Sequence, residues 1–195
     1  KLLVNMKITI HQPEHFPYMG FFEKMKKSDI FVILDDVQYK KNNFQNRNKF
    51  LNKNNVEEFF GVQVEKEATK KHIKDVGVID GKWRKKTLLK IKYNFGLDVT
   101  QIYNHNKLID INMASILWAR KKLNIKTPLV FSSDLKIKST STQRLVDICE
   151  KLNATEYISG MGGKNYLNKD LFNCKISYFF PDISNYYSVI YNIKN

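Results

Sequence analysis

The sequence predicts an α/β fold, a single layered domain over residues 1–195 with a mainly parallel sheet flanked by helices. Short β-branched apolar runs alternate with stretches of helical period, which is the pattern of strands joined by crossover helices. No long linker rich in Pro, Gly or Ser interrupts the chain, and no internal repeat is visible. The 195 residues, 43% of them hydrophobic, suffice for one sizeable core.

The strands are predicted from short apolar runs. The clearest are KITIH at 7–11 and IFVIL at 30–34, whose β-branched residues are typical of buried strands. The other predicted strands are 56–64, 128–132, 156–159 and 175–180.

The helices are predicted from the spacing of apolar residues, at 19–29, 83–96, 107–124 and 139–154, with a short helix after the glycines near 160. The segment 139–154 shows the i, i+3, i+4, i+7 rule most clearly, in Leu145, Ile148, Cys149 and Leu152.

The ends of two helices have their own signals. Thr140 and Gln143 fit a capping box at the start of the segment 139–154. Gly96 is expected to end the helix that starts near Trp83. The polar segment 65–78 is predicted to be a mobile loop.

Composition excludes several classes of protein. No apolar run is long enough to span a bilayer, and 13 Phe and 10 Tyr argue against intrinsic disorder. Residues 1–6 are too short and too weakly basic for a signal peptide, so an expression remnant or a disordered start is expected there. Cys149 and Cys174 have neither metal nor redox spacing, which favours a buried free thiol at Cys149 and a cytoplasmic protein.

The net charge of +14 favours anionic partners, such as nucleic acid, nucleotide phosphates or acidic lipid head groups. The lysines are spread along the whole chain, so most of them are expected on a solvated surface. The charge therefore selects no partner by itself.

Polar segments follow three of the predicted strands. They are HQP at 11–13, DDVQ at 35–38 and SGMGGKNY at 159–166. In parallel α/β sheets, ligands bind outside the carboxyl ends of the strands. If the three strands are neighbours, the three segments converge on one crevice.

His11 is the first candidate catalytic residue, because an imidazole can donate a hydrogen bond, steady a phosphate or pass a proton. The alternative is a buried His that ties a strand end to a loop, but Gln12 and Pro13 follow at once and favour a binding site. Lys24, in the next helix, is expected to stabilise phosphates. A zinc pair with His15 is not expected, because the prolines around it prevent a continuous helix.

Asp35 and Asp36 are the other candidate catalytic residues. Adjacent side chains of an extended chain point to opposite sides, so only one of the two is expected to face a crevice. That carboxylate could hold Mg²⁺, accept a proton from an amine or bind a hydroxyl. A carboxylate that caps a loop explains either residue equally well.

A segment rich in amides and cations follows. Its side chains could bind a carboxylate or a phosphate, Arg47 in a bidentate manner. The candidates are Gln38, Lys41, Gln45, Asn46 and Arg47. A polar surface loop is the alternative, although Tyr39, Phe44 and Phe50 are interleaved and should hold part of the segment still.

The glycine-rich segment leads into a short helix, so its backbone N–H groups would suit an anion, and Lys164 would add charge. It lacks the ending and spacing of a Walker A motif, and the glycines could simply make a sharp turn. The candidate residues are Gly160, Gly162, Gly163, Lys164, Asn165 and Tyr166.

Four elements in this order, HQP, LDDVQ, QNRN and SGMGGKNYL, resemble the WbqC-like protein family, as does WRKKTLLKIKYNF in the middle of the chain. The resemblance implies a bacterial protein of O-antigen, lipopolysaccharide and related surface-polysaccharide synthesis, which transfers glycine or another acyl group to an amino sugar. The ending FFPDISNYYSVIYNIKN departs from the family pattern, whose His-, Pro- and Gln-containing segment is shortened here.

Residues and resemblance together predict an amino-acyl (glycyl-type) transferase or an ATP-dependent amide ligase. The implied partners are a nucleotide-linked amino sugar and a small amino acid or acyl donor. ATP and Mg²⁺ are the implied cofactors, because amide formation from a free carboxylate needs activation. The strand–HQP–helix order is also faintly similar to nucleotidylyltransferases and pantothenate synthetase, a likeness at the level of fold alone.

The alternative function is a non-catalytic module that binds a sugar nucleotide or nucleic acid. The net charge of +14 and the aromatics at Tyr39, Phe44 and Phe50 would motivate nucleic-acid binding. It is not favoured, because no recognition helix or known binding motif is visible.

Overall fold

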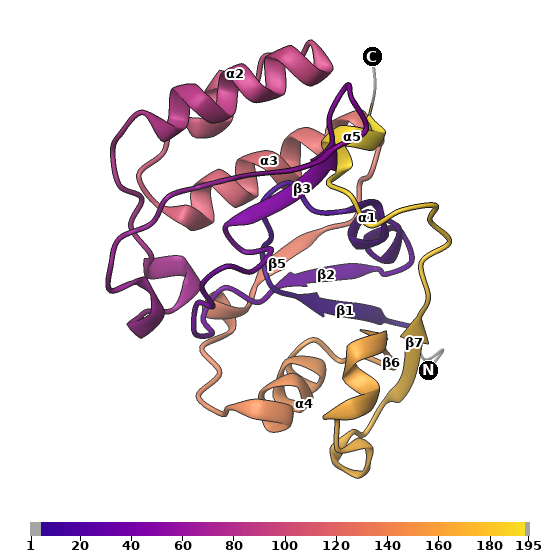
Figure 1. Cartoon of the computed structure of the whole chain (residues 1–195). Helices are drawn as coiled ribbons and strands as arrows, with labels where there is room; N and C mark the ends of the chain where they lie inside the picture. Colours follow the sequence, from indigo (N-terminus) through magenta and orange to yellow (C-terminus); the bar gives the residue numbers. More distant parts are fainter. Residues whose placement is uncertain (1–4, 194–195) are drawn as a thin grey trace. The chain divides into compact units, whose positions relative to one another are not determined.

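Five of the six predicted strands pair in parallel in one sheet, which confirms the α/β class (Figure 1). The computed structural model describes residues 5–193. Part of the expectation for residues 1–6 falls on residues 1–4, which lie outside the described residues. Among the described residues, no helix combines the length and the apolar character needed to cross a bilayer.

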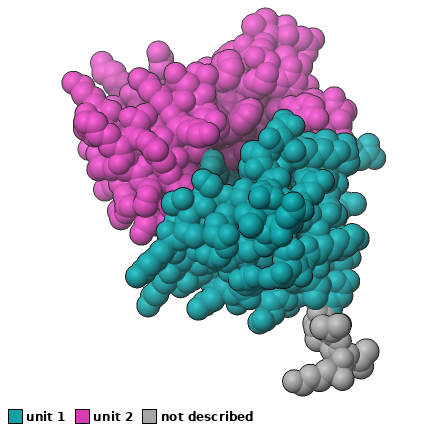
Figure 2. Space-filling model, turned by 90° about the horizontal axis from the view of Figure 1, so that it is seen from below, with its two compact units in different colours: residues 1–12, 20–34, 125–182 teal, residues 13–19, 35–124, 183–195 magenta. Residues whose placement is uncertain are grey.

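The contacts divide the chain into two units, coloured separately in Figure 2. Unit 1 contains the residues up to Gln12 together with Gly20–Leu34 and Ile125–Asp182. Unit 2 contains Pro13–Met19, Asp35–Asn124 and the residues from Ile183 onward. The expectation of one domain over residues 1–195 stays a prediction.

The parallel sheet belongs to unit 1, and its strands are arranged in the order β5-β2-β1-β6-β7. The strands are β1 (Lys7–His11), β2 (Ile30–Ile33), β5 (Leu129–Phe131), β6 (Glu156–Gly160) and β7 (Lys175–Phe179). From β1 the chain fills one side of the sheet with β2 and β5, and then the other side with β6 and β7. The strand order therefore reverses between β1 and β6, where Ile8 lies opposite Tyr157.

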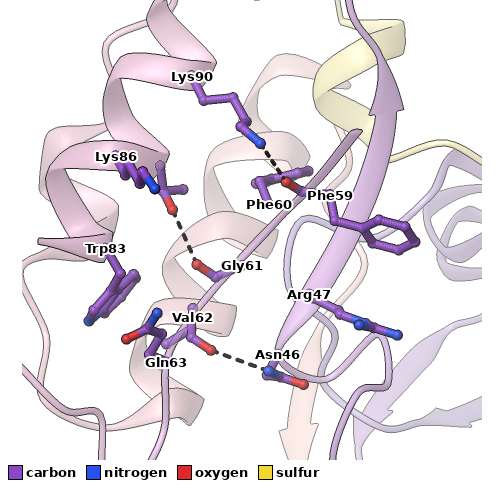
Figure 3. Close-up of a pocket in the computed structure, with 11 residues that line it drawn as sticks. Asn46, Arg47, Phe59, Phe60, Gly61, Val62, Gln63, Trp83, Lys86 and Lys90 are labelled. Atoms are coloured by element: carbon purple, nitrogen blue, oxygen red, sulfur yellow. Dashed lines mark hydrogen bonds between the residues drawn. The ribbon is translucent and has the colours of Figure 1, made fainter. Parts of the chain in front are cut away.

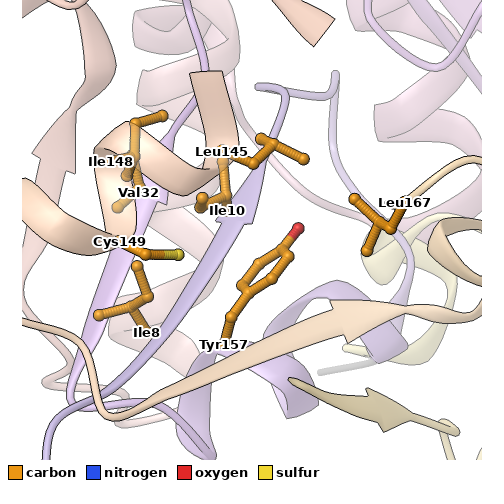
Figure 4. Packing of buried hydrophobic residues seen from close by; sticks show 8 residues of the cluster. All are labelled: Ile8, Ile10, Val32, Leu145, Ile148, Cys149, Tyr157 and Leu167. Atoms are coloured by element: carbon orange, nitrogen blue, oxygen red, sulfur yellow. The ribbon is translucent and has the colours of Figure 1, made fainter. Parts of the chain in front are cut away.

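One face of this sheet packs against α4 (Ser141–Lys151). Alternate residues of a strand point to opposite faces, so Ile8 and Ile10 join the same buried cluster as Leu145 and Ile148 of α4 (Figure 4). Tyr157 from β6 joins the cluster as well. The helical spacing predicted for 139–154 therefore marks a true core face.

The opposite face carries α1 (Met19–Lys26). Phe21 of this helix packs its ring 4.9 Å from that of His11 and 4.9 Å from that of Phe31, between ring centroids. Phe22 and Met25 are fully buried. With helices on both faces, this is a doubly wound arrangement.

The predicted capping box of α4 is wrong. Thr140 occupies the N-cap position, but its side chain makes no capping hydrogen bond. Gln143 instead donates from Nε2 to Oδ1 of Asp147, one turn further on, at 2.7 Å. The side-chain amide of Gln143, which a capping box requires at the start of the helix, is therefore bound to the Asp147 carboxylate instead.

Unit 2 contains a two-stranded antiparallel ribbon, β3 (Arg47–Leu51) with β4 (Glu57–Gly61). Its helices are α2 (Trp83–Phe95), α3 (Leu108–Lys122) and the short α5 (Val189–Asn192). Strand β3 was not predicted, because RNKFL has only two apolar residues. Gly96 ends α2 as expected, in a left-handed conformation with φ of 69°.

The segment 65–78, predicted to be a mobile loop, is anchored at several points. It forms 3₁₀ turns at Ala68–Lys70 and Ile73–Asp75. Ile73 and Val76 are fully buried, and Gly77 forms an isolated bridge with Lys107. A few apolar residues in a polar stretch are enough to pack it.

Candidate functional site

The point where the strand order of unit 1 reverses is the first candidate site. His11 is the last residue of β1, and Gly160 is the last residue of β6. Ligands of open α/β sheets bind outside the carboxyl ends of the strands at such a reversal. The strands before HQP, DDVQ and SGMGGKNY are neighbours in the order β2-β1-β6, as the sequence argument required.

His11 is neutral at physiological pH. Burial, together with the nearby charge of Lys24, lowers its pKa to about 3, although its bond to Gln12 acts in the opposite direction. Nδ1 lies 3.0 Å from the carbonyl oxygen of Gln12, which can only accept, so Nδ1 donates and Nε2 is the unprotonated nitrogen of the ring. An acceptor nitrogen suits an amine or a hydroxyl better than a phosphate.

Lys24 lies near the same strand ends. Its side chain is buried, with 4% of the residue exposed. A Cβ atom at Gly160 would lie 3.9 Å from its Nζ, so the amine is close to the end of β6. A cation with little water around it attracts an anion more strongly than an exposed one does.

The two glycines of the turn Met161–Asn165 have different surroundings. A Cβ atom at Gly163 would collide with Oγ of Ser159 and lie 3.0 Å from Cδ1 of Leu167. A Cβ atom at Gly162 would meet nothing within 4 Å. Packing therefore requires glycine at 163, which agrees with the alternative that the glycines serve a sharp turn. The backbone at Gly162, in contrast, is open to a ligand.

The rest of the glycine-rich segment lies on the β7 side. The ammonium of Lys164 is 5.2 Å from the ring centroid of Tyr178 and 5.1 Å from that of Phe180. Asn165 and Tyr166 are exposed. Sequence reasoning missed Tyr178, whose buried hydroxyl has no hydrogen-bond partner among residues 5–193. A tyrosine in a predicted strand is not recognisable from the sequence as a candidate site residue.

The carboxylates and their neighbours belong to unit 2. Asp35 is 3% exposed, and its backbone oxygen accepts a hydrogen bond from the backbone N–H of Lys74 at 3.0 Å. Asp36 is half-buried. Gln38 donates from Nε2 to the backbone oxygen of Thr69 at 2.7 Å. Convergence of these residues with the two segments of unit 1 stays a prediction.

No group of three or more His, Cys, Asp and Glu that could hold a metal ion occurs in the described part of the chain. Mg²⁺ commonly takes only one or two carboxylates from the protein and keeps water or phosphate oxygens as its other ligands. Asp35 or Asp36 would fit that limited role, and neither would form a complete metal site.

Two amides of the QNRN segment have structural contacts. Oε1 of Gln45 accepts from the backbone N–H of Lys40 at 2.8 Å. Asn48 donates from Nδ2 to the backbone oxygens of His15 and Phe16, at 3.3 and 2.9 Å. Both side chains are almost fully buried. The binding role predicted for Gln45 stays a prediction.

Asn46 and Arg47 line a cavity of about 380 Å³ between β4 and α2 (Figure 3). Asn46 is bound to Val62 twice, through its backbone oxygen at 2.8 Å and its Nδ2 at 3.2 Å. A side chain at Gly61 would collide with the backbone oxygen of Asn46, so this close approach requires glycine. Lys41, which is exposed, lines a neighbouring cavity of about 310 Å³ together with Asn46.

The other wall of the 380 Å³ cavity consists of residues that sequence reasoning did not select. Trp83 and Lys86 reach it from α2. The run WRKK at the start of that helix combines an aromatic with cations, and this is the signal that could have identified them.

The aromatics proposed for stacking on bases are mostly inaccessible. Tyr39 is 2% exposed and Phe50 is fully buried, whereas Phe44 is 45% exposed. Burial also raises the pKa of Tyr39 to about 12, partly offset by the charge of Arg47. The nucleic-acid alternative thus loses two of its three stacking partners.

Comparison with known proteins gives a consistent result. The model of the WbqC-like protein family matches residues 12–191. The chain is 28% identical over 181 residues to an uncharacterized protein of Mycobacterium tuberculosis, Rv1507c, with 86% of this chain and 78% of that protein covered. No solved structure matches the chain. Since the family model spans almost the entire sequence, the chain belongs to the WbqC-like protein family.

Proposed function

We propose that the protein is a cytoplasmic enzyme of bacterial surface-polysaccharide synthesis that forms an amide on a nucleotide-linked amino sugar. It acts as an amino-acyl (glycyl-type) transferase or as an ATP-dependent amide ligase. The observation that carries the proposal is the pairing, at the β1–β6 strand ends, of a neutral acceptor at His11 with a buried cation at Lys24.

Each of the two groups would have its own role in amide formation. The sugar amine must be neutral and correctly oriented. Nε2 of His11 would accept a hydrogen bond from one N–H of the amine, while the lone pair of the amine nitrogen faces the acyl carbon. The C–N bond forms, the bond from the acyl carbon to its leaving group breaks with its electron pair going to the leaving group, and the surplus amine proton passes to solvent water, because an imidazole with a pKa of about 3 does not keep it. Lys24 would stabilise the negative charge that the leaving group gains.

The remaining roles follow the same chemistry. The open backbone at Gly162 and the ammonium of Lys164 would bind phosphate oxygens of the activating nucleotide. Mg²⁺, where required, would be held in part by Asp35 or Asp36. ATP would supply the activation, because a free carboxylate does not acylate an amine by itself.

Product formation tests the proposal directly. Purified protein with ATP, Mg²⁺, glycine and a thymidine-diphosphate 4-amino sugar is expected to give a glycyl amide, detected by mass spectrometry. A panel of other small amino acids and amino sugars covers the unknown donor and acceptor. Absence of an amide across the whole panel would overturn the proposal.

Two variants test the residues, and one control lies on the helix that carries Lys24. His11→Asn and Lys24→Met are expected to lower kcat at least about a hundredfold, the usual scale for lost orientation of a reactant or lost charge stabilisation. Lys26→Met, an exposed position of the same helix, should change kcat less than about twofold. Full activity of folded His11→Asn would contradict the role assigned to the imidazole.

A further inference from the structure

The cavity between β4 and α2 has features of a ligand site that lies wholly within unit 2. Its volume of about 380 Å³ falls within the range of small-molecule pockets, roughly 300–1,000 Å³. Its aromatic wall consists mainly of Phe59, because Phe60 and Trp83 also line the cavity but are only 4% and 6% exposed. Phe59 is 48% exposed, so a ligand in the cavity can reach its ring.

Three cations reach the cavity, and only one of them is neutralised. Lys90 forms an ion pair with Glu58 at 2.9 Å, and this pairing lowers the pKa of the Glu58 carboxyl. Arg47 and Lys86 form no ion pair with any described residue. Figure 3 shows Lys86 on α2 and Arg47 on β3, on either side of β4. The cavity therefore has a net positive lining.

Arg47 is held in a way that leaves it able to bind an anion. Its guanidinium lies over the ring of Phe59, 4.9 Å from the centroid. An aromatic ring accepts no conventional hydrogen bond, so the N–H donors of this guanidinium remain able to meet two oxygens of a phosphate. The neighbouring Asn46 adds a buried Oδ1 without a hydrogen-bond partner among the described residues, which could accept from a ring N–H.

Size and lining select the class of ligand. A free amino acid such as glycine would leave most of the cavity empty, and inorganic phosphate would make no use of the aromatic wall. A nucleoside diphosphate combines a planar base with phosphates that carry about two to three negative charges, and it is large enough to fill the cavity.

We propose that this cavity binds a nucleoside diphosphate, with the phosphates on Arg47 and Lys86 and the base against the aromatic wall. This inference deepens the proposed function, since it assigns the nucleotide part of a nucleotide-linked sugar to unit 2. It does not require catalysis, because nucleotide binding can be measured without turnover.

The chain has a built-in reporter for the test. It contains two tryptophans, and Trp83 lines the cavity whereas Trp118 does not. In a Trp118→Phe background, titration with thymidine diphosphate is expected to change Trp83 fluorescence, and calorimetry gives the Kd in the unmodified protein. Thymidine and inorganic phosphate, each alone, should bind at least about tenfold more weakly, because each lacks half of the contacts.

Variants that remove the charge of Arg47 on β3 or of Lys86 on α2 test whether the nucleotide binds in this cavity. Arg47→Gln is expected to raise the Kd about tenfold or more, and Lys86→Gln by several fold, on the scale of lost charged hydrogen bonds. Lys85→Gln is the matched control: Lys85 is also exposed on the same helix, the change in charge is the same, and the residue lies outside the lining of this cavity. The Kd of Arg47→Lys should fall between those of the unmodified protein and Arg47→Gln, because lysine keeps the charge but cannot form two parallel hydrogen bonds to a phosphate.

Three results would overturn the inference. One is a Kd that Arg47→Gln and Lys86→Gln leave unchanged, especially if Lys24→Met raises it instead. Another is equal binding of inorganic phosphate and thymidine diphosphate. The third is much tighter binding of an oligothymidylate with a steep salt dependence, which would indicate a nucleic-acid surface.

The two proposals fail in different ways. Amide formation that survives in Arg47→Gln with an unchanged KM for the sugar nucleotide would contradict only the cavity assignment. Nucleotide binding that depends on Arg47, without any amide product, would contradict only the proposed reaction.

Discussion

At the scale of single residues, Asn48 shows how a buried amide can hold a turn of backbone in place. Asn48 is 1% exposed, and its Nδ2 donates hydrogen bonds to the backbone oxygens of both His15 and Phe16. Its Oδ1 accepts from the backbone N–H of Lys49 at 2.8 Å. Each buried backbone group that loses its partner costs stability, because water cannot replace the lost bond.

Asn48→Ala is therefore expected to lower the free energy of unfolding by about 2 kcal/mol, since it orphans buried groups and leaves a small void. Ser188 also donates to the Phe16 oxygen, at 2.8 Å, which limits the loss. Urea denaturation measures the effect, with Asn54→Ala at an exposed position as control. A loss below about 0.5 kcal/mol in the Asn48 variant would contradict the structural role.

The same segment marks what residue-level prediction can and cannot reach. The sequence identifies QNRN as unusual, but the partners of each amide come from distant parts of the chain. Asn48 reaches His15, 33 positions away, and Asn46 reaches Val62, 16 positions away. A polar side chain therefore looks the same in the sequence whether it ties backbone together or lines a cavity.

At the scale of elements, the predictable parts are those with a local signal. The spacing of Leu145 and Ile148 marks the buried face of α4, and Gly96 marks the end of α2. Strand β3 has no such signal, because only Phe50 and Leu51 are apolar in it and the alternation of its burial depends on pairing with β4. The capping box of α4 fails for a similar reason, since Asp147 competes for Gln143.

The C-cap of α2 allows a clean test of backbone conformation. Gly96 has φ of +69°, and a Cβ atom there would meet nothing within 4 Å, so a substitution changes the conformational energy without a clash. Gly96→Ala is expected to destabilise the protein by about 1 kcal/mol, and Gly96→Asn by less, because Asn tolerates the left-handed region.

Thermal and urea unfolding of the two variants give the comparison. Equal stability of Gly96→Ala and the parent would mean that α2 ends in another way. A larger loss in Gly96→Asn than in Gly96→Ala would point to side-chain contacts rather than to backbone strain.

At the scale of the whole molecule, the alternation of strands and helices predicts the parallel sheet, but not the order of its strands. Pairing of β1 with β6 joins residues that are more than 140 positions apart, such as Lys7 and Glu156. The two units are interleaved along the chain without any linker of distinctive composition. Composition and periodicity are local properties, so neither could reveal this division.

Each unit contains one histidine that is held neutral. His11 in unit 1 and His15 in unit 2 both have their pKa lowered to about 3, mainly by burial. Nε2 of His15 also lies 3.0 Å from the hydroxyl of Tyr103. In an unfolded chain both imidazoles would titrate near pH 6.5.

These shifts predict a loss of stability in mild acid. Because each folded-state pKa lies below the unfolded value, the unfolded chain binds more protons between about pH 6.5 and 3, and stability falls as the pH falls through that window. Two such groups together are expected to lower the free energy of unfolding by about 2 kcal/mol between pH 7 and 5.5.

Urea denaturation across this range tests the expectation separately from the carboxylates. Asp98 and Asp147, whose pKa values are lowered by hydrogen bonds, would be protonated only at lower pH. His15→Gln and His11→Gln should each remove about half of the dependence on pH, whatever their effect at pH 7, because each variant removes one of two titrating groups. A stability that stays constant from pH 7 to 5.5 would mean that the two imidazoles titrate near the same pH in the folded and unfolded states, which would contradict the lowered pKa of both histidines.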